Sequence, residues 1–194
     1  VFQYDGRTAG SPIPSYTITQ TNPFGLIRPG YSGIIYSAPT LADLDSDADL
    51  DMLVGGGDGS FYYFQNTGSI FSPAFLAPQV NPFGITNRGI SANPVFSDID
   101  GDGDFDLLTG ERNGNTWFQK NTSASGSATP AFAAAVSNPF GLTDVGSSSR
   151  PTFADIDFDG DLDALIGNSD GNTLVQRNTG SKIAPAFATA SGSD

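Results

Sequence analysis

The sequence contains neither cysteine nor histidine. A chain without these residues has no thiol nucleophile, no imidazole general base and none of the nitrogen and sulfur ligands that zinc prefers. The absence of cysteine does not identify a compartment, because such a chain requires no particular redox state. Lys120 and Lys182 are the remaining amine candidates for catalysis. This inventory predicts a protein that is not an enzyme.

Positive charge is also scarce. Eight Lys and Arg residues stand against 21 Asp and Glu residues, which gives a formal net charge of −13. Nucleic acids and anionic membranes both favour Lys and Arg, so we expect neither as a partner. No apolar run is long enough to cross a bilayer, and no segment has the order of regions of a signal peptide. Membrane insertion is therefore not expected, and a cationic partner is.

The residues that are abundant favour short strands and turns. The chain of 194 residues has 24 Gly, 13 Pro and 15 Phe, whereas Glu occurs once, as Glu111. Gly and Pro mark turns, and aromatic residues favour strands over helices. The length allows one domain or an array of similar units. Because the sequence begins at Val1 rather than Met, we expect a processed product or a piece of a longer protein.

An internal repeat is the most informative pattern in the sequence. Asn-Pro-Phe-Gly followed by Leu or Ile occurs at residues 22–26, 81–85 and 138–142. Each copy is followed by a Pro, namely Pro39, Pro94 or Pro151, and then by a segment with Asp at every second position. These acidic segments are residues 43–51, 98–106 and 155–163. The acidic segments are therefore a repeated motif rather than a single chance cluster.

Each acidic segment is followed by the pattern of a small antiparallel sheet. A short apolar run ends in Gly, a turn dipeptide such as Asp58-Gly59 follows, and an aromatic or β-branched run comes next. A fourth strand is expected around residues 73–75, 130–132 and 185–187. Four short strands in a repeated unit of about 55 residues are typical of a β-propeller blade. A β-sandwich would not repeat its loop chemistry at a fixed period.

The predicted fold is therefore all-β, a β-propeller-type array of four-stranded antiparallel blades. We expect an outer half-blade at residues 1–21 and three complete blades at residues 22–80, 81–137 and 138–194. Closed propellers typically need four to eight blades. This chain alone should therefore not close, and its exposed strand edges should pair with further blades of its own kind or of a longer parent chain.

The spacing of the aspartates predicts cation binding. Carboxylates at positions 1, 3, 5 and 9 of a tight loop direct several oxygens at one point, and Ca²⁺ takes six to eight such ligands in flexible geometry. Gly103 and Gly160, at position 6, allow the sharp turn. Position 7 would offer its backbone carbonyl, with its side chain pointing outward. A solvated acidic tail does not explain this regularity. An EF-hand needs a Glu at position 12 and flanking helices, and the sequence indicates neither.

The whole pattern resembles a known repeat. Asp-x-Asp-x-Asp-Gly-x-x-Asp between two strands, with Phe-Gly upstream, resembles the FG-GAP repeats of integrin α-subunit propellers and the related VCBS-type repeats of secreted bacterial proteins. The Phe-Gly pairs begin at Phe24, Phe83 and Phe140, and the resemblance covers nearly the whole chain. It implies a propeller fold and an extracellular setting, either secreted or at the cell surface, but no single activity.

The resemblance also implies the residues that hold about three Ca²⁺ ions, one per acidic loop. The side-chain ligands would be Asp43, Asp45, Asp47 and Asp51; Asp98, Asp100, Asp102 and Asp106; and Asp155, Asp157, Asp159 and Asp163. Asp49, Asp104 and Asp161 would contribute their backbone carbonyls. The first loop departs from the motif because Ala48 replaces the glycine. A left-handed Ala costs roughly 1 kcal/mol, so we expect this loop to bind its ion most weakly.

The predicted function is a non-catalytic extracellular repeat module in which calcium acts as a structural staple. Its use would be adhesion or self-assembly into a larger propeller, array or filament. Two alternatives remain: a lectin-like propeller that binds a glycan or protein ligand, and a scaffold fragment of a secreted enzyme. The aromatic residues Tyr31, Tyr36 and Trp117 are candidate ligand contacts, although each is better explained by packing between blades.

Overall fold

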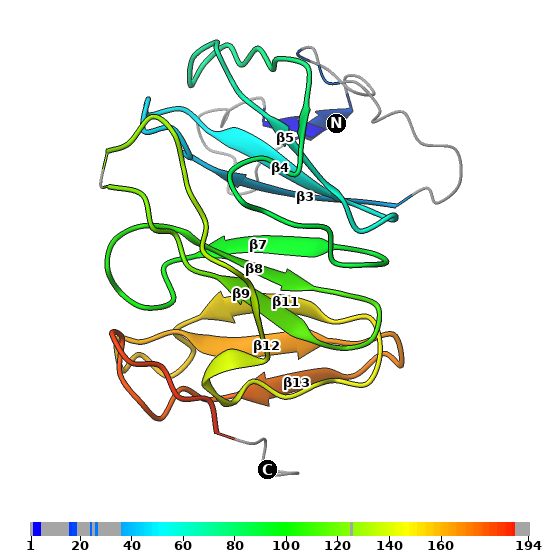
Figure 1. Cartoon of the computed structure of the whole chain (residues 1–194), viewed down its shortest axis with the longest axis vertical. Helices are drawn as coiled ribbons and strands as arrows, with labels where there is room; N and C mark the ends of the chain where they lie inside the picture. Colours follow the sequence, from blue (N-terminus) through cyan, green and yellow to red (C-terminus); the bar gives the residue numbers. More distant parts are fainter. Residues whose placement is uncertain are drawn as a thin grey trace, which may run out of the picture.

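The computed structural model describes residues 2–4, 16–18, 24, 26, 36–124 and 126–188. Three antiparallel sheets follow one another along the chain and are stacked face to face, with the N-terminal sheet at one end of the stack and the C-terminal sheet at the other (Figure 1). Within these residues the one helical element is the 3₁₀ turn Pro139–Gly141. No helix in the described part of the chain is long and apolar enough to cross a membrane. The all-β prediction is confirmed.

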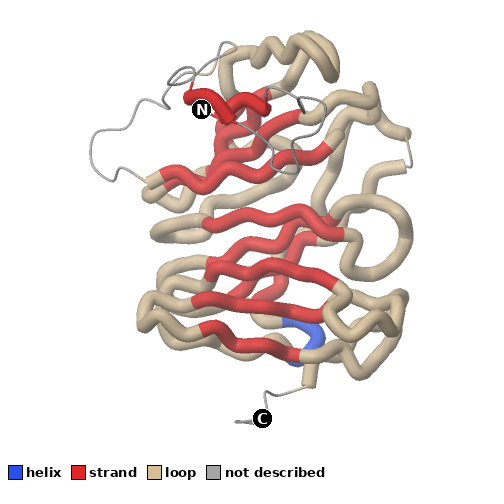
Figure 2. The backbone as a smooth tube through the Cα atoms, turned by 180° about the vertical axis from the view of Figure 1, so that it is seen from behind, coloured by secondary structure: helices blue, strands red, loops and turns tan. Residues whose placement is uncertain are grey.

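The three sheets share one topology, in which each strand pairs with its neighbour in sequence (Figure 2). The first sheet consists of β3 (Ser37–Ala42), β4 (Asp51–Gly56), β5 (Phe61–Phe64) and β6 (Gln79–Val80). The second consists of β7 (Asn93–Ser97), β8 (Asp106–Gly110), β9 (Thr116–Gln119) and β10 (Val136–Ser137). The third consists of β11 (Arg150–Ala154), β12 (Asp163–Gly167) and β13 (Thr173–Gln176). Separately, β1 (Phe2–Tyr4) pairs with β2 (Tyr16–Ile18).

Turn residues in the sequence explain where the hairpins of each sheet form. The second and third strands of each sheet are joined through Gly59, Gly114 or Gly171, whose φ angles are 80°, 99° and 84°. Positive φ costs glycine little, which is why the Asp-Gly and Asn-Gly dipeptides occupy these positions. The acidic loops join the first and second strands, so that Ala42 pairs with Asp51 at the base of the first loop.

The fourth strand lies later in the chain than the sequence predicts. Phe75, Phe132 and Phe187 form only isolated bridges with Asn66, Asn121 and Asn178. The regular fourth strands are the two-residue segments Gln79–Val80 and Val136–Ser137. One reason is that the preceding Pro has no N–H to donate. Another is that the Asn66 side chain accepts the amide hydrogen of Ala74, at 2.8 Å. The equivalent positions of the third repeat lie beyond Ala188, outside the described residues.

Apolar layers between consecutive sheets form the core. The first layer contains Ala42, Leu44, Leu53, Phe61 and Tyr63 from the first sheet and Ile85, Ala92, Leu107 and Phe132 from the second. The second layer contains Ile99, Leu108, Phe118, Leu142, Ala164, Ile166 and Phe187. The first strands β3, β7 and β11 contact one another in succession. The described sheets form an open stack, and a complete propeller with a defined blade count remains a prediction, as do the blade boundaries. The predicted half-blade lies largely outside the described residues.

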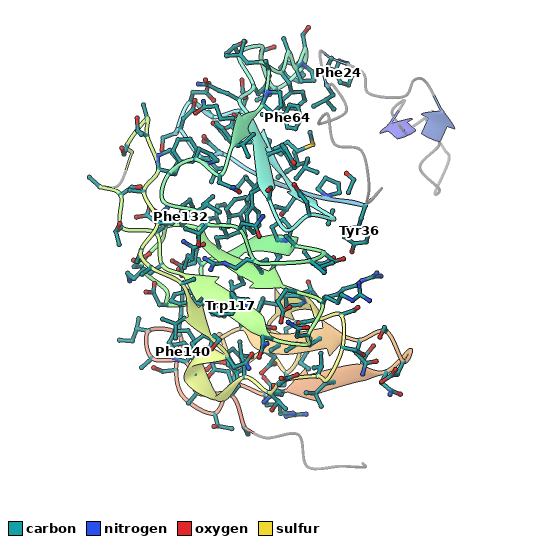
Figure 3. The ribbon with its side chains drawn as sticks, turned by 45° about the vertical axis from the view of Figure 1, so that its right-hand side comes forward. Phe24, Tyr36, Phe64, Trp117, Phe132 and Phe140 are labelled. Atoms are coloured by element: carbon teal, nitrogen blue, oxygen red, sulfur yellow. The ribbon has the colours of Figure 1, made fainter. Side chains whose placement is uncertain are left out.

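The repeated Phe-Gly pairs connect neighbouring sheets. Phe83 adopts a φ of 62° and Gly84 one of 83°. This turn directs the Phe83 carbonyl at the amide of Phe132, 2.9 Å away, while the Phe83 ring meets Tyr63 of the first sheet edge to face at 4.9 Å. Phe140 repeats both contacts with Phe187 and Phe118. Phe132 and Phe140 are labelled in Figure 3. The pairs that begin at Phe83 and Phe140 therefore belong to the interfaces between consecutive sheets.

Candidate metal centres

The acidic loops have the same backbone path although their sequences differ. Each leaves the first strand of its sheet and returns as the second. Two residues in each loop have positive φ, at positions 4 and 6: Ser46 and Ala48, Gly101 and Gly103, and Phe158 and Gly160. A residue in the left-handed region reverses the chain direction locally. Two such reversals wrap each loop into a compact turn in which the side chains at loop positions 1, 3 and 5 face the same space.

This path brings the first three aspartates of each loop together. In each loop, one carboxylate oxygen from each of the three residues lies within 4.8 Å of the others. The three triads are Asp43, Asp45 and Asp47; Asp98, Asp100 and Asp102; and Asp155, Asp157 and Asp159. Three negative groups at such distances repel one another strongly unless a cation neutralises them.

Backbone amides hold the triads in place. Asp43 accepts the amide hydrogens of Asp47 and Ala48, at 3.2 and 3.1 Å. Asp155 makes the same two contacts with Asp159 and Gly160, at 3.2 and 3.1 Å. Amide donors stabilise the ionised form of a carboxylate and fix its orientation. The first and third triads are therefore preorganised by their own loops.

Several carboxylate oxygens in these loops are buried without any hydrogen-bond partner. They are Oδ1 of Asp45, Asp49, Asp98, Asp100 and Asp161 and Oδ2 of Asp106. Each of the three loops contributes at least one of them. A buried polar atom left unpaired costs roughly 1–3 kcal/mol, and a charged one costs more. A hard divalent cation would satisfy these oxygens, so the residues present fit a Ca²⁺ ion.

The ninth residues of the loops lie beneath the triads rather than in them. Asp51, Asp106 and Asp163 are almost completely buried. Asp51 accepts hydrogen bonds from the amide of Asn66 and the hydroxyl of Tyr63, both at 2.8 Å. Asp106 and Asp163 accept the equivalent amides of Asn121 and Asn178, also at 2.8 Å. These aspartates tie each loop to the end of the third strand, and their role as calcium ligands remains a prediction.

Burial has an electrostatic consequence for these ninth residues. Desolvation raises the pKa of Asp51 to about 6 and that of Asp106 to about 7. The amide and hydroxyl hydrogen bonds act in the opposite direction, but they do not cancel the effect of burial. Without a bound cation, these two carboxyl groups therefore gain protons at a much higher pH than an exposed aspartate.

The seventh residues differ from the expectation. Their side chains were expected to point outward, yet Asp49 and Asp161 are buried, and Asp104 is half-buried. The left-handed residue at position 6 turns the chain back, so the next side chain lies against the loop. Burial and the neighbouring carboxylates raise the pKa of both Asp49 and Asp161. Both residues are close enough to the triads for their charges to interact with them.

In two of the three loops a Lys or Arg side chain contacts the aspartates, and these contacts were not predicted from the sequence. Lys120 forms ion pairs with Asp100 and Asp102, and Arg177 forms one with Asp157 at 2.8 Å. In the first loop the uncharged Gln65 donates to Asp45, at 2.7 Å. These three residues occupy the same repeat position, directly after the third strand. The shared repeat position could have predicted these contacts from the sequence, because a residue that directly follows the third strand lies next to the acidic loop of its own sheet.

The aromatic candidates for ligand binding are occupied by packing contacts. The guanidinium carbon of Arg88 lies 5.1 Å from the centre of the Trp117 ring, and that of Arg150 lies 5.8 Å from the Tyr36 ring. Figure 3 shows Trp117 on the second sheet and Tyr36 beside the first. The first contact joins the segment before β7 to β9 of the same sheet, and the second joins β11 of the third sheet to the residue that precedes β3 of the first. Tyr31 lies outside the described residues.

Comparison with known families explains why the three loops look alike. A family model described as FG-GAP-like repeat matches residues 43–109 and 98–166. The chain belongs to this FG-GAP-like repeat family. Each match begins at the first aspartate of one loop and runs into the second strand of the next sheet. Each match thus contains two consecutive acidic loops and the segment between them. A comparison with curated protein sequences found no significant match.

Proposed function

We propose that this chain is a non-catalytic calcium-binding module of an extracellular protein and that it serves adhesion or self-assembly. In each of its three acidic loops, one ion would act as a structural staple. The observation that carries the proposal is the geometry of the triads, with three convergent carboxylates per loop and buried oxygens that have no other partner. An ion bound there joins the first and second strands of its sheet.

The donor set favours calcium over other metals. Every donor around the triads is an oxygen, and the chain has no Cys or His that would attract zinc or copper. Magnesium demands a stricter octahedral arrangement and gives up its water reluctantly, whereas calcium accepts irregular clusters of carboxylates. Three calcium ions would change the formal charge from −13 to −7, because each adds two positive charges.

The repetition of the site favours a structural role over catalysis. An active site is normally a single arrangement, whereas here the same triad occurs once in each of the three sheets. FG-GAP-like repeats are typically non-enzymatic and typical of extracellular proteins. Loops of modest affinity would be filled at an extracellular calcium concentration near about 1 mM. The exposed side chains of Ile156 and Val175 at the C-terminal end of the stack support a use in assembly or adhesion.

Calcium titration tests this proposal. Isothermal titration calorimetry should show about three sites, and 1 mM calcium should raise the midpoint of thermal unfolding above its value in EGTA. Asp45→Asn, Asp100→Asn and Asp157→Asn should each remove one site. Asp170→Asn, in an exposed turn outside the loops, should retain all three. The absence of saturable binding at millimolar calcium, or equal unfolding midpoints in calcium and EGTA, would contradict the proposal.

A further inference from the structure

The turn that follows β13 extends from the third sheet to the acidic loop of the second. Ser181 and Ala184 exchange backbone hydrogen bonds at 3.1 and 3.0 Å, so Lys182 lies at the tip of a tight turn. The Asn178 side chain fixes the base of this turn, because its Oδ1 atom accepts two backbone amide hydrogens, at 3.0 and 2.9 Å. We call residues 178–187 the outer turn of the third sheet.

Lys182 lies directly on the acidic loop of the second sheet. A Cβ atom added to Gly101, at position 4 of that loop, would lie 2.7 Å from Cγ of Lys182 and 2.9 Å from its carbonyl oxygen. Both the backbone and the aliphatic part of Lys182 therefore contact the loop. Its ammonium nitrogen lies 3.9 Å from Oδ2 of Asp98, the first aspartate of the second triad. A cavity of about 180 Å³, lined by Lys182, Asp98 and Gly160 among others, adjoins this contact and gives the ammonium group space to move.

The residue at position 4 of the loops differs in a way that matches this contact. The left-handed backbone at this position does not by itself require glycine, because Ser46 and Phe158 adopt φ angles of 61° and 64° there. Gly101 instead leaves the space that Lys182 fills. Phe158, on the third loop, has a side chain that is 91% exposed. The second loop is therefore shaped to receive Lys182, and this evidence is independent of the ion pair.

The outer turn is also tied to the acidic loop of its own sheet. The amide of Asn178 donates to Oδ1 of Asp163, the ninth residue of the third loop, at 2.8 Å. Arg177, the preceding residue, pairs with Asp157 of the third triad, also at 2.8 Å. The outer turn therefore contacts the third loop at its base and the second loop at its tip.

The interface between the first and second sheets does not have this charge. The corresponding turn of the second sheet, residues 121–132, contains no charged residue. It lies beside the first loop, because residues of this turn and Asp43 line a common cavity of about 250 Å³. In the turn of the first sheet, Ile70 occupies the position of Lys182. Lys182 thus distinguishes the border between the second and third sheets.

We propose that Lys182 couples calcium binding at the second loop to the outer turn of the third sheet. While the triad is empty, the ammonium group of Lys182 neutralises part of the charge of Asp98. When the triad holds a divalent ion, that group is repelled and leaves Asp98, so the outer turn loses the contact at its tip. Such coupling is reciprocal, so Lys182 lowers the calcium affinity of the second loop. The inference rests on the proposed function, because it requires calcium at the second triad.

Isothermal titration calorimetry tests the effect on affinity in a chain that carries Asp45→Asn and Asp157→Asn, which leaves the second triad as the intact one. In this background Lys182→Gln should strengthen calcium binding roughly two- to five-fold, the range for an exposed ion pair. Lys182→Arg should bind like the parent because it keeps the charge. Arg112→Gln removes the same charge at the exposed far end of β8 and should leave the affinity unchanged. No gain in Lys182→Gln, or an equal gain in Arg112→Gln, would overturn the inference.

A probe on the outer turn tests the transmission itself, which a change of affinity would not show. The chain has no Cys, so Ile183→Cys, at a side chain that is 75% exposed, gives a single labelling site for an environment-sensitive fluorophore. In the same background, calcium should change the emission of this label, and Lys182→Gln should abolish most of that change. Phe71→Cys, at the matching position of the first sheet and 91% exposed, should give no calcium response.

The two levels of the argument fail separately. If the second loop binds calcium while the Ile183→Cys label does not respond, or while the Phe71→Cys label responds equally, the coupling is wrong and the proposed function stands. If the wild-type chain binds no calcium, the proposed function is wrong and the inference falls with it.

Discussion

Ala48 shows how one residue can weaken one of three similar loops. Its φ is 73°, in the region where Gly103 and Gly160 have 97° and 98°. Ala48→Gly should therefore raise the free energy of unfolding by about 1 kcal/mol and strengthen calcium binding by the first loop. Urea unfolding in EGTA measures the first effect. Gly160→Ala is the reverse control: an added Cβ meets nothing within 4 Å there, so any loss reports backbone strain alone. A less stable Ala48→Gly chain would refute this reading.

Lys120 is expected to compete with calcium for the second loop. Its ammonium group contacts Asp100 and Asp102, which hold the pKa of Lys120 above its ordinary value. A cation that binds the triad must displace this group, so Lys120→Gln should raise the calcium affinity of the second loop several-fold, on the order of 1 kcal/mol. Calorimetry in a chain that also carries Asp45→Asn and Asp157→Asn isolates this loop. Lys120→Arg should retain the wild-type affinity, and an unchanged affinity in Lys120→Gln would exclude competition.

Among the described residues no Lys or Arg contacts the first loop, and this difference opposes the effect of Ala48. Gln65 places no positive charge beside Asp45, which favours calcium there, whereas the strained backbone of Ala48 disfavours it. The sequence-based expectation that the first loop is the weakest therefore depends on backbone strain outweighing competition by Lys120 and Arg177.

Asp106 should make stability depend on pH when calcium is removed. Burial raises its pKa to about 7, from 3.8 for an exposed aspartate. Between these values the folded chain binds more protons than the unfolded chain, so the free energy of unfolding falls as pH rises from about 4 to about 7. Urea unfolding in EGTA should show this decrease, and Asp106→Asn should reduce it, with Asp51, whose pKa is raised to about 6, contributing the remainder. Stability that increases with pH across this window would contradict the assignment.

At the scale of the element, the glycine that ends each second strand controls how closely two sheets approach. Gly110→Val should lower the free energy of unfolding by roughly 1–3 kcal/mol, because its side chain would collide with the chain at Ser149. Gly167→Val, at the open equivalent position, should change the stability of the monomer little. Urea unfolding of the two variants at low protein concentration compares them directly. Equal losses would mean that intrinsic strand propensity, not contact between sheets, explains the glycine.

Much of the architecture follows from the repeat in the sequence. Alternating aspartates, Gly turns and apolar runs recur at the same spacing, so three copies support one another in predicting the loops and the first three strands. The fourth strand was predicted at residues 73–75 because these residues are apolar. In the structure the side chain of Asn66 accepts the amide hydrogen of Ala74, eight positions later, and the sequence spacing did not reveal this contact. Likewise, the side-chain direction of Asp49 depends on the φ of Ala48, which spacing alone does not reveal.

The charge of the whole molecule should control its stability more than any single ion pair. Fifteen of the 21 acidic residues lie in the three loops. In EGTA, their mutual repulsion should be screened by salt, so raising the NaCl concentration from 20 to 300 mM should raise the thermal midpoint. In saturating calcium this dependence should shrink, because the ions already neutralise the loops. Differential scanning calorimetry compares the two series, and an equal salt effect in both would argue against neutralisation by calcium.

The contacts of the Phe-Gly pairs predict the order in which the sheets unfold. Phe83 pairs its carbonyl with Phe132 of the second sheet while its ring covers Tyr63 of the first, and Phe140 connects the next two sheets in the same way. No sheet can unfold without uncovering an aromatic ring of its neighbour. The middle sheet has two such neighbours and each end sheet has one described neighbour, so opening should begin at the ends and reach β7–β9 last. Cooperativity in this fold is thus a property of the borders between repeats.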